Sequence, residues 1–166
     1  MNDMGHNRGF TLIEIAVVML VIVIVLGIVS VNLEPDRESA VRDEAKRLVL
    51  LLRTAQEEAI LQGKMLAVAF EAQGYSFQVL DDKNEFQPLP QDDVLRPRPL
   101  PQGIEISSVD IEGAPETGTP RLLLLPTGEL PPFTITFERG EIRWQVQGLP
   151  TGKITAQVAP LLPGKA

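Results

Sequence analysis

Apolar residues are concentrated in one long block near the start of the chain. Phe10 to Leu33 form this block, which is interrupted mainly by Glu14, and the fifteen residues from Ile15 to Val29 carry no charged or strongly polar side chain. As a helix the block is roughly 36 Å long, enough to cross a hydrocarbon core about 30 Å thick with some tilt. We therefore predict a membrane-spanning helix over residues 10–33.

A second apolar pattern follows Pro35 and has the spacing of an amphipathic helix. Six residues spaced 4, 3, 4, 3 and 4 apart lie on one helical stripe, namely Val41, Ala45, Leu48, Leu52, Ala55 and Ala59. The pattern predicts a helix over residues 34–63 that ends at Gly63. Pro35 either kinks one long helix or separates two. On the charged opposite face, the acid-first spacing predicts two ion pairs, Glu38 with Arg42 and Asp43 with Arg47.

From residue 64 onward the pattern becomes that of short strands separated by turn residues. Seven segments are predicted strands: Met65 to Glu71, Tyr75 to Leu80, Ile104 to Ile111, Arg121 to Leu125, Phe133 to Glu138, Glu141 to Gln147 and Lys153 to Val158. Asp81 to Pro101 contains five prolines and is predicted to be an exposed loop. Residues 64–166 are thus expected to form a β-rich domain, which makes the whole chain an α+β protein.

Charge and composition exclude several classes of function. Lys and Arg number 15 against 22 Asp and Glu, a net charge of −7, and residues 31–166 retain −6 once Arg8, Asp3 and Glu14 are set aside. So acidic a domain lacks the basic surface that binds duplex nucleic acid. The absence of cysteine excludes disulfides and thiolate metal sites, and the one histidine, His6, precedes the apolar block. We expect no cofactor, no metal and no bound nucleic acid.

Two carboxylate pairs in the predicted loop are the main candidates for catalysis or cation binding. Asp81-Asp82 and Asp92-Asp93 could hold a hard cation or act as acid and base, but neither pair has EF-hand spacing. A solvated acidic loop is therefore the favoured interpretation. No histidine follows His6 to activate a serine or threonine, so the sequence argues against an enzyme.

Trp144 and two loop arginines are the remaining candidates for binding. Trp144 alternates with Ile142 and Val146 along a predicted strand, which favours a core or inter-sheet position over an exposed anchor for a partner. Arg96 and Arg98 lie between prolines and are expected at the surface of the loop.

Glu14 is the informative residue of the apolar block. A carboxylate at the centre of a spanning helix costs about 2.5 to 3.5 kcal/mol, and less near the end of the helix. Glu14 either reaches the aqueous interface or waits for a cationic partner that arrives on assembly. The sequence leaves both interpretations open.

The residues around Glu14 carry a resemblance to a known family. Gly9-Phe10-Thr11-Leu12-Ile13-Glu14, followed by an aliphatic run, resembles the class III signal of type IV pilins and type II secretion pseudopilins. The resemblance implies that prepilin peptidase removes residues 1–9 by cutting after Gly9 and methylates the new N-terminus, Phe10. Such a cut would leave a positively charged amine on Phe10, four residues before Glu14, and we expect the two to form a charge pair on assembly because pairing offsets the desolvation cost of each ion. The leader departs from the pattern in having Arg8 as its one firm positive charge.

Three later segments narrow this resemblance. Glu57 to Gly63, Gly74 to Phe77 and Leu125 to Phe133 are similar to the H-type minor pseudopilins of type II secretion and to FimT/FimU-like minor pilins. The resemblance implies a pilin-like fold, with the long N-terminal helix packed on small antiparallel sheets.

It also implies a set of partners: other minor pseudopilins, the major pseudopilin, prepilin peptidase, an inner-membrane assembly platform and membrane lipid. The predicted function is that of a minor pseudopilin, single-pass in the inner membrane with its C-terminal domain in the periplasm. The alternatives are a minor pilin of a pilus or competence system, some relatives of which bind DNA, and a tethered periplasmic enzyme.

Overall fold

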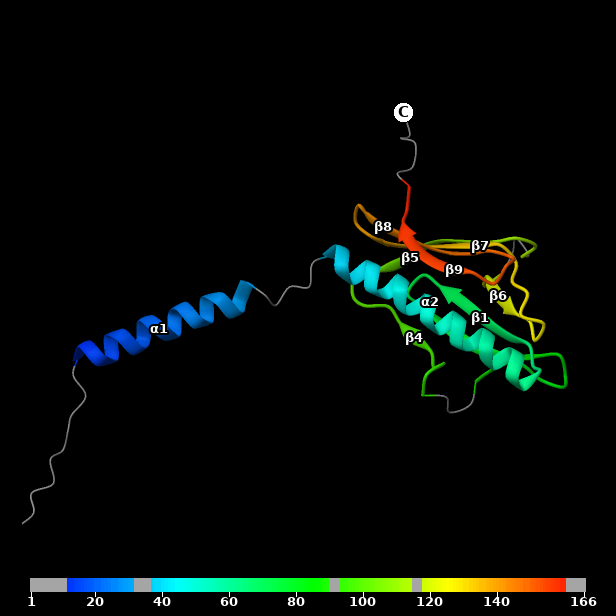
Figure 1. Ribbon diagram of the computed structural model, residues 1–166, viewed down its shortest axis with the longest axis horizontal. Coiled ribbons are helices and arrows are strands. Elements are labelled where there is room, and N and C mark those ends of the chain that lie inside the picture. Colours follow the sequence, from blue (N-terminus) through cyan, green and yellow to red (C-terminus); the bar gives the residue numbers. More distant parts are fainter. Residues whose placement is uncertain (1–11, 32–36, 90–92, 115–117, 161–166) are drawn as a thin grey trace, which may run out of the picture. The chain divides into compact units, whose positions relative to one another are not determined.

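The computed structural model describes residues 12–31, 37–89, 93–114 and 118–160, which fall into two compact units, Met1–Pro35 and Asp36–Ala166. The first unit contains helix α1 (Leu12–Val31), and the second contains helix α2 (Arg37–Gln62) and all the strands described below (Figure 1). Residues 32–36 lie outside the described residues, so the role of Pro35 stays a prediction.

Helix α2 has the apolar stripe and the end point that its sequence predicts. All six stripe residues from Val41 to Ala59 are completely buried. Gly63 follows the last helical residue with φ of 63°, a left-handed conformation that favours glycine. The Lys64 N–H donates to the Ala59 carbonyl and the Gly63 N–H to the Ile60 carbonyl, which together form a Schellman cap.

The two ion pairs predicted along α2 are wrong. Arg47 pairs with Glu44, one turn before it, at 2.7 Å between Nη1 and Oε2, and Arg42 contacts its neighbour Asp43 at 3.4 Å. Arg47 pairs with Glu44 because this carboxylate is buried and more strongly needs a cationic partner than the exposed Asp43 does.

The strands form two antiparallel sheets. Sheet A has the order β3-β2-β1-β6, with β4 also paired to β2; its strands are β1 (Leu66–Glu71), β2 (Gly74–Leu80), β3 (Phe86–Pro88), β4 (Arg98–Pro99) and β6 (Arg121–Leu124). Sheet B has the order β5-β7-β8-β9, with strands β5 (Glu105–Ile111), β7 (Phe133–Arg139), β8 (Ile142–Gly148) and β9 (Ile154–Val158). The chain therefore passes from sheet B to sheet A and back as it runs through β5, β6 and β7.

The seven predicted strands are confirmed, but the prediction that residues 81–101 form only a loop is wrong. Two short strands in this segment, β3 and β4, pair with the same edge of β2. Their prolines are tolerated because Pro88 and Pro99 stand at positions whose N–H would point away from β2. Gly74 permits the close approach of β4, since a Cβ there would lie 2.6 Å from the Arg98 carbonyl oxygen.

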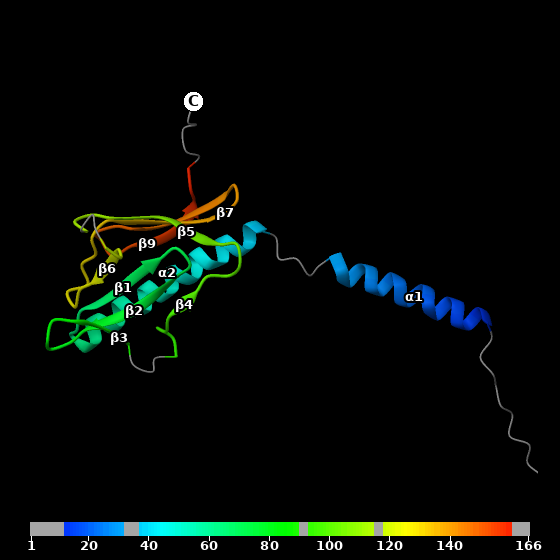
Figure 2. The same cartoon turned by 180° about the vertical axis from the view of Figure 1, so that it is seen from behind.

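A single core joins α2 to both sheets. Leu48 and Leu52 of the helix, Val68 and Phe77 of sheet A, and Phe137 of sheet B belong to one cluster of buried side chains. Figure 1 shows α2 in front of β1, and Figure 2 shows sheet A from the opposite side. The arrangement confirms the predicted α+β fold, in which one helix covers two small antiparallel sheets.

We expect the second unit to fold without the first. A chain that lacks residues 1–33 keeps the whole stripe of α2, which is buried within its own unit. The truncated protein should be soluble, show mixed helix and strand signals by circular dichroism, and unfold in one cooperative transition. Aggregation at micromolar concentration, or a transition without cooperativity, would contradict this expectation.

Candidate functional site

Glu14 lies in the first turn of α1, where its side chain is exposed. A carboxylate at this end of a helix interacts favourably with the helix dipole. Gly9 and Phe10, the predicted cleavage and methylation residues, lie outside the described residues. The structure therefore places one of the three predicted site residues, and the charge pair between Phe10 and Glu14 stays a prediction.

Helix α1 presents large aliphatic side chains on all its faces. Those from Leu12 to Ile24 are exposed by at least 45%, and Leu12 reaches 89%. A helix that is apolar all round is normally covered by protein or lipid. Among the described residues, no helix meets the combined length and hydropathy requirement for crossing a membrane. The exposed aliphatic surface nevertheless marks α1 as an interaction element.

A buried polar cluster connects α2 to sheet A. Glu44 is 2% exposed, and its two carboxylate oxygens have different partners. The Tyr75 hydroxyl donates to Oε1 at 2.9 Å, and Arg47 Nη1 donates to Oε2 at 2.7 Å. Burial, followed by the nearby Glu44 carboxylate, raises the pKa of Tyr75 far above its ordinary value. The phenol is therefore a permanent donor to the carboxylate at physiological pH.

The pairing of Glu44 with Tyr75 and Arg47 was not predicted from the sequence. Glu44 sits three residues after Val41 and four before Leu48, on the flank of the predicted stripe. That position is the signal that could have identified it, because i, i+3 and i+4 neighbours share a helix face. Its partner Tyr75 could not have been named from spacing, since the pairing depends on how the helix lies across β2.

The carboxylate pairs of the predicted loop, Asp81-Asp82 and Asp92-Asp93, were candidates for catalysis or cation binding. Asp81 Oδ1 accepts the backbone N–H groups of Lys83 and Glu85, each at 2.9 Å, which shapes the turn before β3. Asp82 and Asp93 are exposed, and Asp92 lies outside the described residues. In the described part of the chain, no three acidic or histidine side chains gather as metal ligands would.

Trp144 and the loop arginines lie in different parts of the domain. Trp144 is half-buried on β8, opposite Phe137 of β7 and Val158 of β9, and it packs against the core. Arg96 is exposed as predicted, whereas Arg98 is half-buried on β4 and donates to the Val94 carbonyl at 2.9 Å.

Comparison with known proteins gives two matches to families along the chain. Residues 4–30 match the prokaryotic N-terminal methylation motif, and residues 44–152 match the family described as type II transport protein GspH. Three relatives share the name type II secretion system protein H. The Pseudomonas aeruginosa PAO1 protein is 30% identical over 82% of this chain and 87% of its own length. The Aeromonas hydrophila protein is 28% identical over 79% of this chain and 80% of its own length. The Klebsiella pneumoniae protein is 28% identical over 79% of this chain and 86% of its own length.

Solved structures show the same fold. Two structures of the minor pseudopilin EpsH from the Vibrio cholerae type II secretion system superpose with TM-scores of 0.59 and 0.62. Their sequences are 22% and 19% identical to this one, and the matches cover 71% and 74% of this chain and nearly all of theirs.

An aliphatic N-terminal helix that lies almost entirely within a match to the methylation motif and precedes this α+β domain defines a pilin-like protein. More specifically, the chain belongs to the GspH family, the H-type minor pseudopilins of the type II secretion system.

We expect Tyr75→Phe to lower the free energy of unfolding by about 1 to 3 kcal/mol, because it leaves one oxygen of a buried carboxylate without its donor. Urea unfolding of the full chain in detergent measures the change. Thr54→Ala, which removes an exposed hydroxyl on the same helix, is the control and should have little effect. Equal stability of Tyr75→Phe and the wild type would mean that the cluster contributes nothing to the fold.

The same variant should also alter the pH dependence of stability. In the unfolded chain the Tyr75 phenol loses its proton at about pH 10. In the folded protein the pKa of Tyr75 is raised, so the phenol keeps its proton above that pH. The stabilisation that the protonated Tyr75 phenol gives to the folded protein is therefore complete below about pH 10 and is lost as the pH rises through the raised pKa. The alkaline loss should be smaller in Tyr75→Phe.

Proposed function

We propose that this protein is a non-catalytic assembly subunit that acts through α1, and that its periplasmic domain is carried on this helix into the pseudopilus. The observation that supports the proposal best is the match to the methylation motif over residues 4–30, which includes most of α1, a helix with exposed aliphatic side chains and Glu14 in its first turn. Such a helix can pack in lipid before assembly and against other helices afterwards.

Processing is the first step of this function. Prepilin peptidase cuts after Gly9 on the cytoplasmic side, and the new N-terminus, Phe10, is methylated. Residues 10–33 stay as the membrane anchor, which keeps the domain in the periplasm. Support comes from the motif and from the apolar composition of the block, which has one acidic residue near its start.

Assembly then depends on a charge pair. Cleavage creates a positively charged amine on Phe10, about one helical turn before Glu14, and this amine can face its own Glu14 or that of a neighbouring subunit. Pairing offsets a desolvation cost of several kcal/mol per ion in an apolar environment. A neighbour in correct register thus relieves both charges, whereas a misaligned one leaves them unpaired.

The partners follow from this mechanism. The other minor pseudopilins and the major pseudopilin supply the neighbouring helices, and the inner-membrane assembly platform moves the subunits out of the lipid. The assembled pseudopilus supports the export of folded proteins across the outer membrane. The domain contributes surfaces for protein contact and performs no chemistry.

Cleavage should be abolished by Gly9→Val, since a branched side chain replaces the residue before the cut. Intact-mass measurement of membrane-extracted protein should give a wild-type chain that begins at N-methylated Phe10 and a variant that keeps residues 1–9. Ala16→Val, a similar enlargement outside the cleavage site, is the control and should be processed normally. A wild-type chain that is uncleaved, or cut after residue 30, is incompatible with this processing step.

Glu14→Ala should separate assembly from processing. We expect normal cleavage and membrane insertion, but at least about a tenfold loss of co-purification with the other pseudopilins, because the Phe10 amine then stays unpaired. Glu14→Asp, one methylene shorter, should retain part of the assembly. The processed band is the internal control in each sample. Wild-type incorporation of Glu14→Ala would eliminate the charge pair while leaving the processing step intact.

A further inference from the structure

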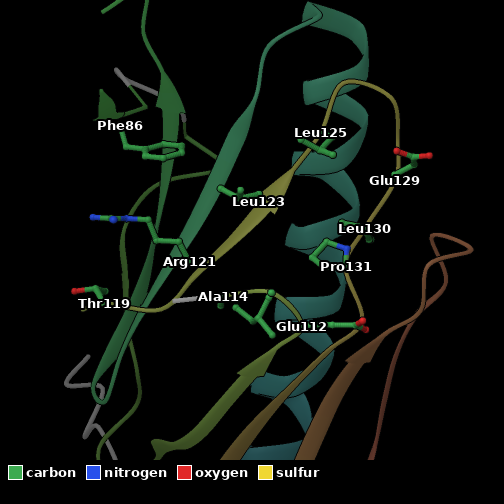
Figure 3. A pocket seen from close by; sticks show the side chains of 12 residues that line it. Phe86, Glu112, Ala114, Thr119, Arg121, Leu123, Leu125, Glu129, Leu130 and Pro131 are labelled. Carbon is green, nitrogen blue, oxygen red and sulfur yellow. The ribbon is translucent and has the colours of Figure 1, made fainter. Parts of the chain in front are cut away.

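An apolar groove of about 540 Å³ lies between the edge of sheet A and the end of β5. Figure 3 shows Phe86, Arg121 and Leu123 on one side and Leu130 and Pro131 on the other. All the residues that line the groove belong to the second unit, and none belongs to α1. Its size is within the range of ligand-binding clefts in proteins.

Two residues of β6 that line this groove have backbone hydrogen-bonding groups that do not bond to β1. Phe70 N–H donates to the Pro120 carbonyl, and the antiparallel register then makes Leu122 and Leu124 the residues that bond to β1. The N–H and C=O groups of Arg121 and Leu123 consequently point away from β1. In the described part of the chain β6 pairs with β1 only, and Arg121 and Leu123 both line the groove.

A free strand edge beside an apolar groove is the combination that accepts an added strand. Unpaired backbone groups supply hydrogen bonds to any extended segment, while the groove supplies contacts for alternate side chains. Leu123 is 36% exposed and Leu125 is half-buried, so part of this apolar surface is open. We propose that β6 binds an extended segment of another protein, rich in aliphatic and basic residues, as an additional strand of sheet A.

The charge of the groove lining indicates that the bound segment is basic. Glu112 and Glu129 contribute two carboxylates to its lining, and neither belongs to an ion pair among the described residues. The Arg121 guanidinium lies over the Phe86 ring, 5.7 Å from its centroid, and so occupies the opposite wall. A lysine or arginine of the segment would meet the two acidic side chains.

The same electrostatics argue against a second copy of this chain as the occupant. Residues 31–166 carry a net charge of −6, so two copies repel each other at neutral pH. A partner with a basic strand is instead attracted to the two carboxylates.

The test uses the full chain in detergent and a short capped peptide of alternating lysine and valine. We expect the peptide to shift the amide resonances of Arg121 and Leu123 and to slow their hydrogen exchange about tenfold at saturation. A peptide methylated on its backbone nitrogens, or one with glutamate in place of lysine, should bind at least about tenfold more weakly. Equal binding of the methylated peptide, resonance shifts away from β6, or no saturation at millimolar peptide would overturn the proposal.

Leu123→Pro removes an outward N–H from β6 without touching the bonds to β1, and it should abolish binding. Val109→Pro removes an outward N–H from β5, the edge of sheet B, and should bind the peptide as the wild type does. If Leu123→Pro does not fold, Glu112→Gln combined with Glu129→Gln provides the second variant, with at least about a fivefold weaker affinity expected. Unchanged affinity in that variant, or a wild-type dimer that the variant dissociates, would refute the basic partner.

Discussion

One helix must bury the same stripe against two sheets, and the arrangement of the domain depends on this constraint. Ala45, Ala55 and Ala59 are completely buried, and their small side chains let strands approach α2 closely, while Leu48 and Leu52 fill the space between the layers. Truncating either leucine would cost about 2 to 5 kcal/mol, a large part of the stability of a small domain. The helix and the two sheets share one core.

Apolar packing alone does not fix how a helix is rotated about its axis. The buried Glu44 does so here, because a small rotation of α2 would separate its carboxylate from Tyr75 of β2 while Arg47 of the same helix moved with it. Leaving a buried carboxylate without its donor is expensive, so the polar cluster selects one orientation among many that bury the stripe equally well. The rotation that it selects also determines which residues of α2 face the solvent.

The features of the fold that could be predicted from the sequence are those set by residues close together in the chain. The stripe of α2, the cap at Gly63 and the seven longer strands each follow from spacing or from a turn residue. The short strands β3 and β4 were missed because proline normally excludes strands, and only the edge position of Pro88 and Pro99 makes them possible. The Glu44 cluster and the groove beside β6 involve residues far apart in the chain, which no periodicity brings together. Gly9 and Phe10 were identified by resemblance alone, whereas Glu14 was also identified by the energetic cost of a carboxylate within an apolar block.

The path of the chain through β5, β6 and β7 has a consequence for folding. Since β6 pairs in sheet A while the strands before and after it pair in sheet B, the chain connects the two sheets twice in succession. Pairing of β5 with β7 brings together the two ends of the segment that contains β6, which favours the pairing of β6 with β1. The contacts that link the sheets span long stretches of sequence, which makes folding slow and unfolding all-or-none. A subunit drawn out of a membrane by one end would therefore resist as a single mechanical body.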